Sequence, residues 1–569
     1  MNPPTGRRIE ATMLAVSGLA PAVVAAMLVA NESPAAHDGG VARVLALRAE
    51  PWRATDIVLD SLFSLVPLGT QAARAALAGG LVAGIASAVL YRLGCALLAP
   101  RDGKGALPFV VACIGALAST LARPWQTEAA SVGGSVSGAL LILAPIAVVA
   151  RADADGSQPP ISWPAAAFGL ALALGHEPCV GTCALAGCSA MIGASAPARR
   201  SLAAALRAQP TSLAAAGVAG LALWLVALTR VRLAGAAVPA LSNGWSGETG
   251  ASVGGSPAQY VQNDVGSTLV VLAIVGLAIA ARSPRSRPLA AGLAVVAVLG
   301  PGFAWLGAPV GPTRFGAPLL AGFGATGVLA SATMEAIAAA VAAMKVPLSR
   351  WSAGMVVLLE LVLPVEAADD SLLTSRAARA GYAAAVWNDV AWGTMPLDTV
   401  ALVTSPIILD RAIAARAQGE VRGDIVVAPL CPRCAPPWHA FARDPALVAV
   451  WRDVALTGAP TEASLSAAAA ERTILLAYEP SWGPAAARHL VPFSLFDRFA
   501  PEPRGPSDRR RALDGFAPQR DRLAALTSFD PELSNASVSL LRPRAMRMAK
   551  DGDRALAERA ASDAAAFER

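Results

Sequence analysis

The side chains with the clearest chemical potential are ionisable residues beside long apolar segments. Asp38 is followed by two glycines, which allow backbone to approach a ligand closely, and such a carboxylate can act as a general base or hold a cation. Arg123, Trp125 and Glu128 precede one apolar segment, and His176 ends another. Ionisable groups at membrane depth are costly, so they are candidates for function. The alternative is structural: a solvated turn for Asp38 and interfacial anchors for the others.

The cysteines indicate no metal centre. Cys179, Cys183 and Cys188 have the wrong spacing for a closed zinc site, and their small apolar neighbours are typical of cysteine as a core residue. Cys431 and Cys434 form a CxxC pair. If that segment lies outside the cytoplasm, a local disulfide is expected, with two free thiols as the alternative. A redox pair or a zinc site would need partners that the sequence does not clearly supply.

The composition indicates that lipid is the main solvent. The mean hydropathy is +0.52, and 55% of residues are hydrophobic while 15% are charged. The net charge is +6, but no basic patch with interleaved aromatic residues accompanies it, which argues against nucleic-acid binding. Charges fall between apolar runs up to Pro364 and are scattered from Glu366 onward. We therefore expect a transmembrane domain at residues 1–365, an α/β domain at 366–505 and a polar helical tail at 506–569.

The apolar segments predict a polytopic α-helical membrane protein. A bilayer needs about 20 apolar residues per helix, so we expect roughly ten or eleven transmembrane helices. The segments are 11–30, 72–99, 106–122, 132–150, 162–176, 178–195, 211–230, 267–281, 288–308, 316–343 and 352–364. The first is expected to be a retained helix, because no small-residue cleavage site follows it.

Charge in the loops predicts the orientation. With a cytoplasmic N-terminus, alternation brings every basic loop to the cytoplasmic side, as the positive-inside rule requires. The basic loops contain Arg92, Arg101 and Lys104; Arg199, Arg200 and Arg207; Arg282, Arg285 and Arg287; Lys345 and Arg350. The long loop 31–71 and the C-terminal domain then lie outside the cytoplasm. The expected location of the protein is a bacterial inner membrane. A connection of that length is unusual unless it is functional.

The C-terminal region reads as an α/β domain followed by helices. Residues 400–404 and 424–428 are β-like, the stretch 407–418 between them is helical, and 473–477 predicts another strand. The resulting βαβ unit lacks the glycine fingerprint of a nucleotide site. Because no Ser/His/Asp order or paired carboxylate stands out, we expect an accessory module.

Several short segments share their order with the motifs of one known family. They are His37-Asp38-Gly39-Gly40-Val41, Ser64-Leu65-Val66-Pro67-Leu68-Gly69, Pro124-Trp125-Gln126-Thr127-Glu128, Gly169 to His176, Met395-Pro396-Leu397-Asp398, Arg422 to Val427, Leu490 to Phe493 and Phe499 to Pro503. In this order they resemble a bacterial membrane family of formerly unknown function, which is related to the eukaryotic transmembrane protein O-mannosyltransferases of the GT-C class. No single segment is specific to this family, but the occurrence of all of them in the same order is.

The resemblance implies a GT-C fold whose polyprenyl-phosphate sugar donor arrives from the outer leaflet. It gives Asp38 the role of the outer-loop acid that deprotonates the acceptor hydroxyl or orients the reactants, while basic side chains stabilise the phosphate. The sugar would be mannose or another hexose, and the acceptor a protein or glycan. A divalent cation near Asp38 is left open, since one acid does not make a site. Candidates for binding the donor phosphate or substrate are Arg123, Trp125, Glu128, His176 and Glu50.

The departures from the family leave an alternative function open. Val41 stands where the family has a second loop acid, and Glu50 and Trp52 replace residues of a His-Pro-Pro-Gly-Tyr-Pro stretch. If those residues are essential, the chain is a catalytically degenerate relative that acts as a membrane scaffold. A transporter is less favoured, because polar groups at mid-bilayer and repeated halves are not evident.

Overall fold

The computed structural model describes residues 3–30, 35–45, 52–67, 69–98, 106–150, 162–233, 266–305, 316–343, 349–373, 376–430, 445–479, 482, 484–527 and 529–568. The chain forms two compact units. The N-terminal unit comprises Met1–Ala30, Ala49–Gly69 and Ala73–Ser375, and the C-terminal unit comprises Asn31–Arg48, Thr70–Ala72 and Arg376–Arg569. This division differs from the expected boundary at residue 365. Helix α18 (Val362–Leu373) continues beyond that point, and part of the first loop groups with the C-terminal unit.

The N-terminal unit consists of helices, and each expected apolar segment contains one. The helices are α1 (Pro3–Leu28), α3 (Ala54–Ser64), α4 (Gln71–Leu98), α5 (Leu107–Thr120), α6 (Arg123–Ala129), α7 (Val136–Ala150), α8 (Trp163–His176), α9 (Pro178–Ala194), α10 (Ala196–Ala208), α11 (Pro210–Leu233), α14 (Ser267–Arg282), α15 (Arg287–Trp305), α16 (Ala317–Ala343), α17 (Ser349–Glu360) and α18. The last expected segment is broken, because α17 ends at Glu360 and α18 begins at Val362.

Several of these helices have the length and composition of membrane spans. Among the described residues, four helices qualify individually: Arg7–Leu28, Gln71–Leu98, Pro210–Leu233 and Ala317–Ala343. Two bent pairs raise the number to six, namely α5 with α6 at 67° and α9 with α10 at 112°. Helices α7, α14 and α15 are apolar but shorter. A polytopic membrane protein is therefore confirmed, while the expected number of ten or eleven spans stays a prediction.

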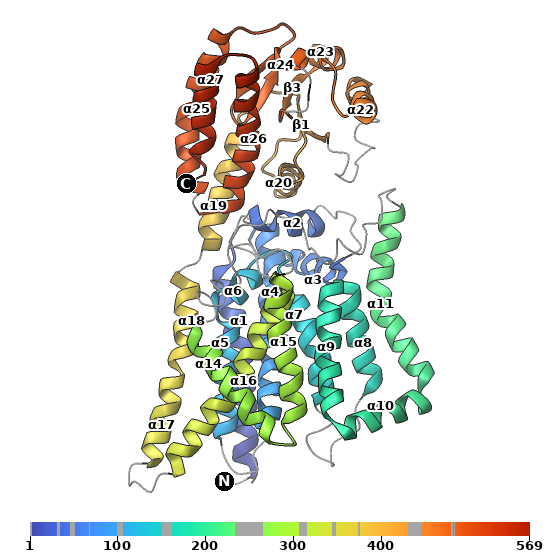
Figure 1. Ribbon diagram of the computed structural model, residues 1–569, viewed down its shortest axis with the longest axis vertical. Coiled ribbons are helices and arrows are strands. Elements are labelled where there is room, and N and C mark those ends of the chain that lie inside the picture. Colours follow the sequence, from blue (N-terminus) through green and yellow to red (C-terminus); the bar gives the residue numbers. More distant parts are fainter. Residues whose placement is uncertain are drawn as a thin grey trace. The chain divides into compact units, whose positions relative to one another are not determined.

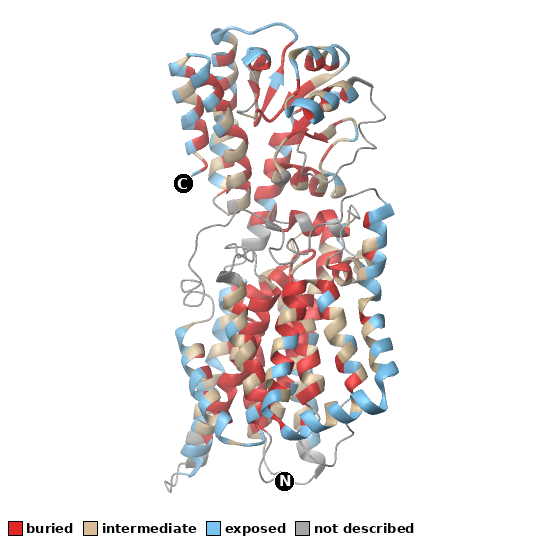
Figure 2. Ribbon diagram, turned by 45° about the vertical axis from the view of Figure 1, so that its right-hand side comes forward, coloured by how far each residue is buried: buried red, intermediate tan, exposed pale blue. Residues whose placement is uncertain are grey.

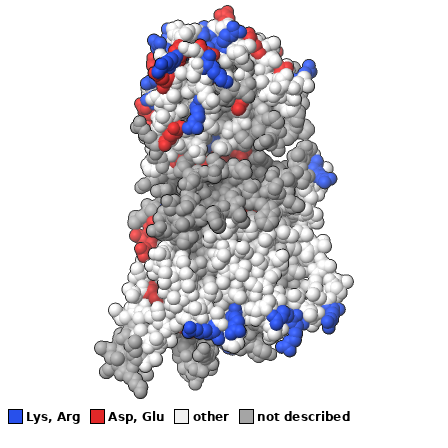
Figure 3. Space-filling view, in the orientation of Figure 1, with Lys and Arg blue, Asp and Glu red and all other residues white. Residues whose placement is uncertain are grey.

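The surface of the N-terminal unit matches a lipid environment. Helix α11 exposes Val218 and Val226 at 64% and 60%, and its apolar window is only 11% buried. Apolar side chains on this scale would be costly in water, whereas lipid tails cover them without cost. Figure 2 shows the exposed outer helices around a buried interior. In Figure 3 the flank of this unit is largely free of charge, while the C-terminal unit carries both signs intermixed.

Basic side chains gather at one end of the N-terminal unit. Helix α10 runs across the lower ends of α8, α9 and α11 in Figure 1, at the same end as the N-terminus. It carries the exposed residues Arg199, Arg200 and Arg207. The side chains of Arg282 and Arg285 are exposed at the turn between α14 and α15, and Figure 3 shows basic residues along this lower edge. The alternation of the loops and the side of the membrane that this end faces stay predictions.

The C-terminal unit combines a five-stranded sheet with helices. The strands are β1 (Thr399–Val403), β2 (Val426–Pro429), β3 (Thr473–Leu476), β4 (Leu490–Phe493) and β5 (Phe496–Phe499), in the order β2-β1-β3-β5-β4. Strand β1 pairs in parallel with β2 and β3, and β5 pairs antiparallel with β3 and β4. Helix α20 (Pro406–Ala417) connects β1 to β2, so the βαβ prediction is confirmed. The β4–β5 hairpin was not predicted.

Helices complete this unit and build its core. They are α2 (Asp38–Val44), which follows the short 3₁₀ helix Ala35–His37; α19 (Arg376–Asn388), α22 (Pro445–Thr457), α23 (Glu462–Glu471), α24 (Pro484–Ala487), α25 (Pro506–Thr527), α26 (Pro531–Lys550) and α27 (Arg554–Ala565). One hydrophobic core joins Trp387 of α19, Ile408 of α20, Phe496 of β5, Phe516 of α25 and Leu541 of α26. The predicted polar helical tail therefore shares its core with the sheet domain rather than standing apart.

Candidate functional site

A buried group of charged side chains lies in the N-terminal unit, around the start of α3. Arg53 precedes the helix in the left-handed conformation with φ of 61°, and Asp56 and Asp60 follow on the same face. All three side chains are buried, with relative exposures of 4%, 3% and 6%. Arg53 Nε lies 2.8 Å from Asp56 Oδ2, and the other oxygen of Asp56 accepts a hydrogen bond from Ser137. We call this group, with the residues added below, the α3 charge cluster.

The turn between α6 and α7 closes one side of the cluster. The backbone N–H of Gly133 donates to Asp60 Oδ2 at 2.8 Å, and that of Ser135 donates to Glu128 Oε2 at 2.8 Å. The carbonyl of Gly134 accepts from Arg53 Nη2 at 2.9 Å. A Cβ at Gly134 would stand 1.9 Å from the Glu128 carbonyl oxygen, so the turn needs glycine. Backbone groups thus compensate part of the cost of burying these charges.

The junction of α8 and α9 also contacts the cluster. His176 ends α8, and its Nδ1 lies 2.5 Å from Thr55 Oγ1, while its carbonyl accepts from the Arg53 backbone N–H at 2.9 Å. Glu177 caps α9, and its Oε1 lies 3.4 Å from Arg53 Nε. The α3 charge cluster therefore joins the end of the first loop to a helix junction more than a hundred positions away in the sequence.

The electrostatics of the cluster do not suit an anion. Burial lowers the pKa of Arg53, but the charges of Asp56, Glu177, Glu128 and Asp60 outweigh it and raise that pKa overall. Four carboxylates thus act on a single guanidinium. A phosphate would meet their repulsion, whereas hydroxyl groups or a cationic group would be accepted. No three His, Cys, Asp or Glu side chains in the described part of the chain are grouped so that they could hold a metal ion.

Asp38 lies in the C-terminal unit rather than in the α3 charge cluster. It begins α2, is 5% exposed, and its Oδ1 lies 2.6 Å from Nη1 of Arg411 on α20. Arg411 Nε in turn donates to Asn388 Oδ1 at 2.9 Å, and its Nη2 lies 3.8 Å from Glu420 Oε2. Just before Asp38, the backbone N–H of Ala35 donates to Asp530 Oδ2 at 2.9 Å. The first-loop acid is therefore held by residues that follow it by several hundred positions.

The proton affinity of Asp38 is set by opposing neighbours. Burial raises its pKa most, Arg411 lowers it, and the charges of Asp530 and Asp410 raise it, so that the pKa lies well above its usual range. Burial also raises the pKa of Asp530, against hydrogen bonds from backbone N–H groups that lower it. A carboxyl group with a raised pKa holds a proton more readily, which is a property of many catalytic acids and bases.

The remaining predicted site residues have varied environments. Trp125 is fully buried, and its Nε1 donates to the Leu320 carbonyl of α16 at 3.0 Å, which is the geometry of an interhelical contact. Arg123 begins α6 with a half-buried side chain. Glu50, Cys431 and Cys434 lie outside the described residues.

The structure therefore joins some predicted site residues and adds others. Glu128 and His176 belong to one cluster, and Asp38 belongs to the other unit. Arg53, Asp56, Asp60 and Glu177 were not among the predicted site residues. The spacing of three and four residues from Arg53 to Asp56 to Asp60 could have indicated a charged helical face within an otherwise apolar stretch.

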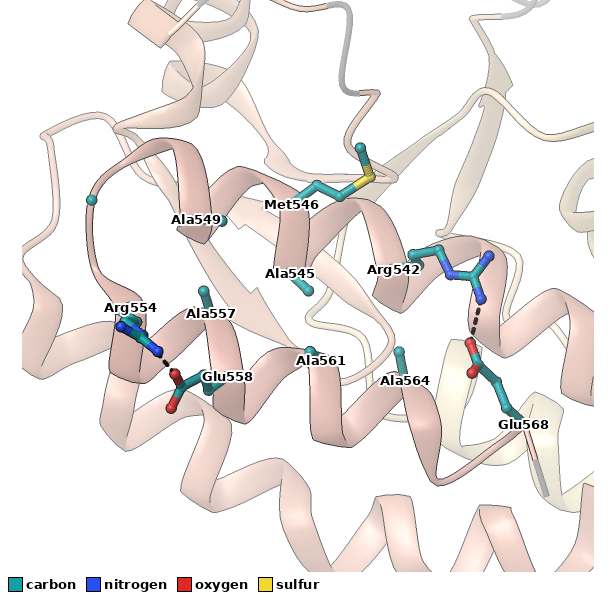
Figure 4. A pocket seen from close by; sticks show the side chains of 11 residues that line it. Arg542, Ala545, Met546, Ala549, Arg554, Ala557, Glu558, Ala561, Ala564 and Glu568 are labelled. Carbon is teal, nitrogen blue, oxygen red and sulfur yellow. Dashed lines mark hydrogen bonds and ion pairs between the residues drawn. The ribbon is translucent and has the colours of Figure 1, made fainter.

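A groove between α26 and α27 offers volume but little chemistry. Figure 4 shows alanine side chains and Met546 along its walls, with an ion pair toward each end, Arg542 with Glu568 and Arg554 with Glu558. The groove has a volume of about 760 Å³. Its four charged residues are paired with each other, and no histidine or thiol is among its lining residues.

Comparison with solved structures identifies the fold. No family model and no curated protein matches the chain. The apo structure of ArnT from Cupriavidus metallidurans matches with a TM-score of 0.54 and 13% identity, over 86% of this chain and 97% of that one. Its complex with undecaprenyl phosphate matches at 0.47 and 13%, over 73% and 89%. An Archaeoglobus fulgidus oligosaccharyltransferase tethered to an acceptor peptide matches at 0.46 and 11%, over 75% and 64%.

The chain is thus a polytopic helical membrane protein with a GT-C-like fold and a C-terminal domain that contains a small sheet. Its structural neighbours are GT-C glycosyltransferases.

Proposed function

We propose that this protein is a membrane glycosyltransferase that moves a sugar from a polyprenyl-phosphate donor to a protein or glycan acceptor outside the cytoplasm. The observation that carries the proposal is the fold, which is similar to that of ArnT over 86% of this chain and 97% of that one. ArnT from Cupriavidus metallidurans has also been solved with undecaprenyl phosphate, and we extend that class of lipid to the present chain. Mannose or another hexose is our proposal for the sugar, on the resemblance of the loop motifs to protein O-mannosyltransferases.

In the proposed reaction Asp38 acts as the general base. Its carboxylate accepts the proton of the acceptor hydroxyl, whose oxygen then bonds to the anomeric carbon as the bond from that carbon to the donor phosphate breaks. The polyprenyl phosphate leaves with the bonding electrons. Burial of Asp38 and its raised pKa fit this role, since they increase the basicity of the carboxylate.

The α3 charge cluster supports the proposal in a different way. Its carboxylates present hydrogen-bond acceptors, which suit the hydroxyl groups of a sugar better than a phosphate. We therefore propose that Glu128 and His176 take part in sugar binding, and that Arg123, whose side chain is half-buried at the start of α6, is the candidate for the donor phosphate. Glu50 remains a candidate for substrate binding, and Trp125 links α6 to α16 through its hydrogen bond to the Leu320 carbonyl. A divalent cation remains a candidate cofactor, and a bacterial inner-membrane location with an external C-terminal domain is part of the proposal.

A second candidate is a catalytically degenerate relative that serves as a scaffold. Two observations favour it: Asp38 is already paired with Arg411, and Val41 stands where the resembled family has an acid. Under this alternative the Asp38–Arg411 pair would only fasten the first loop.

The deciding experiment is a transfer assay on membranes. Wild-type chain and Asp38→Asn, at matched expression, are supplied with polyprenyl-phosphate mannose or glucose carrying a radiolabel, with and without added divalent cation. Transfer by wild type and its loss in Asp38→Asn is the expected result. Asp514→Asn is the matched control, because that carboxylate is exposed on α25. Absence of transfer by wild type from both donors would favour the scaffold.

A further inference from the structure

The segment that carries Asp38 is held by residues late in the chain through more than one bond. The 3₁₀ helix Ala35–His37 and helix α2 pack on α20 and α19 within the C-terminal unit. Arg411 bonds to Asp38 at one end of this segment, and Asp530 accepts the Ala35 N–H just before it. A segment of ordinary connecting loop would not need two buried charged partners from distant parts of the sequence.

Arg411 itself is fixed by residues of its own domain. Its side chain is 1% exposed, Asn388 of α19 accepts from its Nε at 2.9 Å, and Glu420 lies beside its other terminal nitrogen. Asn388 also donates to Glu420, so the partners of Arg411 are bonded to each other. These bonds fix the orientation of the planar guanidinium independently of Asp38. Its Nη1 donates a hydrogen bond to the Asp38 carboxylate.

We propose that Arg411 is a positioning residue for sugar transfer: it holds the carboxylate of Asp38 in place through a charge-assisted hydrogen bond, so the C-terminal unit supports the proposed base. This inference rests on the proposed function, since it assigns a partner to the proposed base. It also changes the interpretation of the C-terminal domain, which the sequence suggested to be an accessory module.

The charged groups around Asp38 determine how removal of Arg411 would change the pKa of Asp38. The neighbours are Arg411 and Asp410 on α20, Asp530 ahead of α26, and His37 next to Asp38 in the chain. Burial and the two aspartates favour the neutral acid, and Arg411 favours the carboxylate. Removing Arg411 leaves the opposing influences in place, so ionisation of Asp38 would require a higher pH.

The test is the dependence of the transfer rate on pH for Arg411→Gln. If Asp38 must be ionised, the acidic limb of the profile moves to higher pH, with roughly a tenfold loss of rate at neutral pH for each unit by which the pKa rises, and with recovery at alkaline pH. The pH profile of Arg411→Lys is expected to lie between those of wild type and Arg411→Gln, because an ammonium can face Asp38 but cannot also bond Asn388 in the same planar geometry. Arg422→Gln is the control, as Arg422 pairs with Asp424 on the surface of the same domain.

Two outcomes overturn the inference separately from the proposed function. If wild type transfers sugar but Arg411→Gln lowers the rate equally at every pH, Arg411 is only structural. The same holds if Arg411→Gln slows the residual reaction of Asp38→Asn as much as it slows wild type. Asn388→Ala covers the case in which Arg411→Gln fails to fold, because it leaves the charge of Arg411 in place and removes the hydrogen bond that orients the guanidinium. An unshifted pH profile of this variant would also overturn the proposal. No transfer by wild type would instead reject the proposed function.

Discussion

Replacement of Arg53 by methionine is the sharpest test of the α3 charge cluster. Methionine keeps an unbranched apolar stem of similar length and removes the guanidinium. The change eliminates the 2.8 Å pair with Asp56, the contact with Glu177 at 3.4 Å and the hydrogen bond to the Gly134 carbonyl. The carboxylates stay buried without that partner, while the backbone donors from the turn after α6 remain.

The expected cost follows from this burial. Removing one partner of a buried ion pair typically costs about 3–5 kcal/mol, since it leaves an uncompensated charge. The pair qualifies as buried, because the side chains of Arg53 and Asp56 are 5% and 3% exposed. At 1.4 kcal/mol for each factor of ten, the opening equilibrium of this region should increase roughly a hundred- to a few thousand-fold.

Buried thiols provide the assay. Cys179, Cys183 and Cys188 lie in α9, directly after Glu177, and all three are buried. Their rate of modification by a thiol reagent in detergent, located by peptide mass spectrometry, reports opening of the region around the α8–α9 junction. In Arg53→Met we expect the modification rate of these thiols to rise by the same factor as the opening equilibrium.

Two comparisons make the result decisive. Arg207→Met, on an exposed arginine of α10, should leave the modification rate unchanged. Adding Asp56→Asn to Arg53→Met should cost less than the sum of the single changes, because it removes one of the unpaired charges. If Arg53→Met reacts no faster than Arg207→Met, the cluster does not stabilise the end of the helical unit and our reasoning is refuted.

Two further predictions follow from the same geometry. Gly134→Ala should disrupt the turn after α6 and expose the α9 thiols, since its Cβ would approach the Glu128 carbonyl to 1.9 Å; Gly217→Ala on α11, where nothing lies within 4 Å, should be neutral or slightly stabilising. Asp530→Asn should reduce the pH dependence of unfolding of the full-length protein, measured by calorimetry. The pKa of Asp530 is higher in the folded state than in the unfolded state. The stability of the wild type therefore falls as the pH rises from the unfolded-state pKa through the folded-state pKa. The asparagine variant does not lose this stability, and its side-chain oxygen still accepts the hydrogen bond from the Ala35 N–H. An unchanged profile for Asp530→Asn would contradict this linkage.

Local pattern was sufficient for most secondary structure. Long apolar runs have one solution in lipid, because a helix satisfies every backbone hydrogen bond internally, and each run is indeed helical. The strand from Thr399 and the helix that follows it were predictable from β-branched residues and helical spacing. The hairpin of β4 and β5 was missed, since its strands have four residues each and a proline interrupts the first.

The sequence by itself determined that this is a membrane protein with helices at these positions, because the free energy of burying apolar residues depends on composition and local periodicity. Only the tertiary structure decided which acids meet which bases. Asp38 pairs with Arg411, and Asp56 pairs with Arg53 beside His176. Such pairings depend on long-range packing of α2 on α20 and of α3 on the helix ends, and an isolated carboxylate in a sequence carries no information about its distant partner.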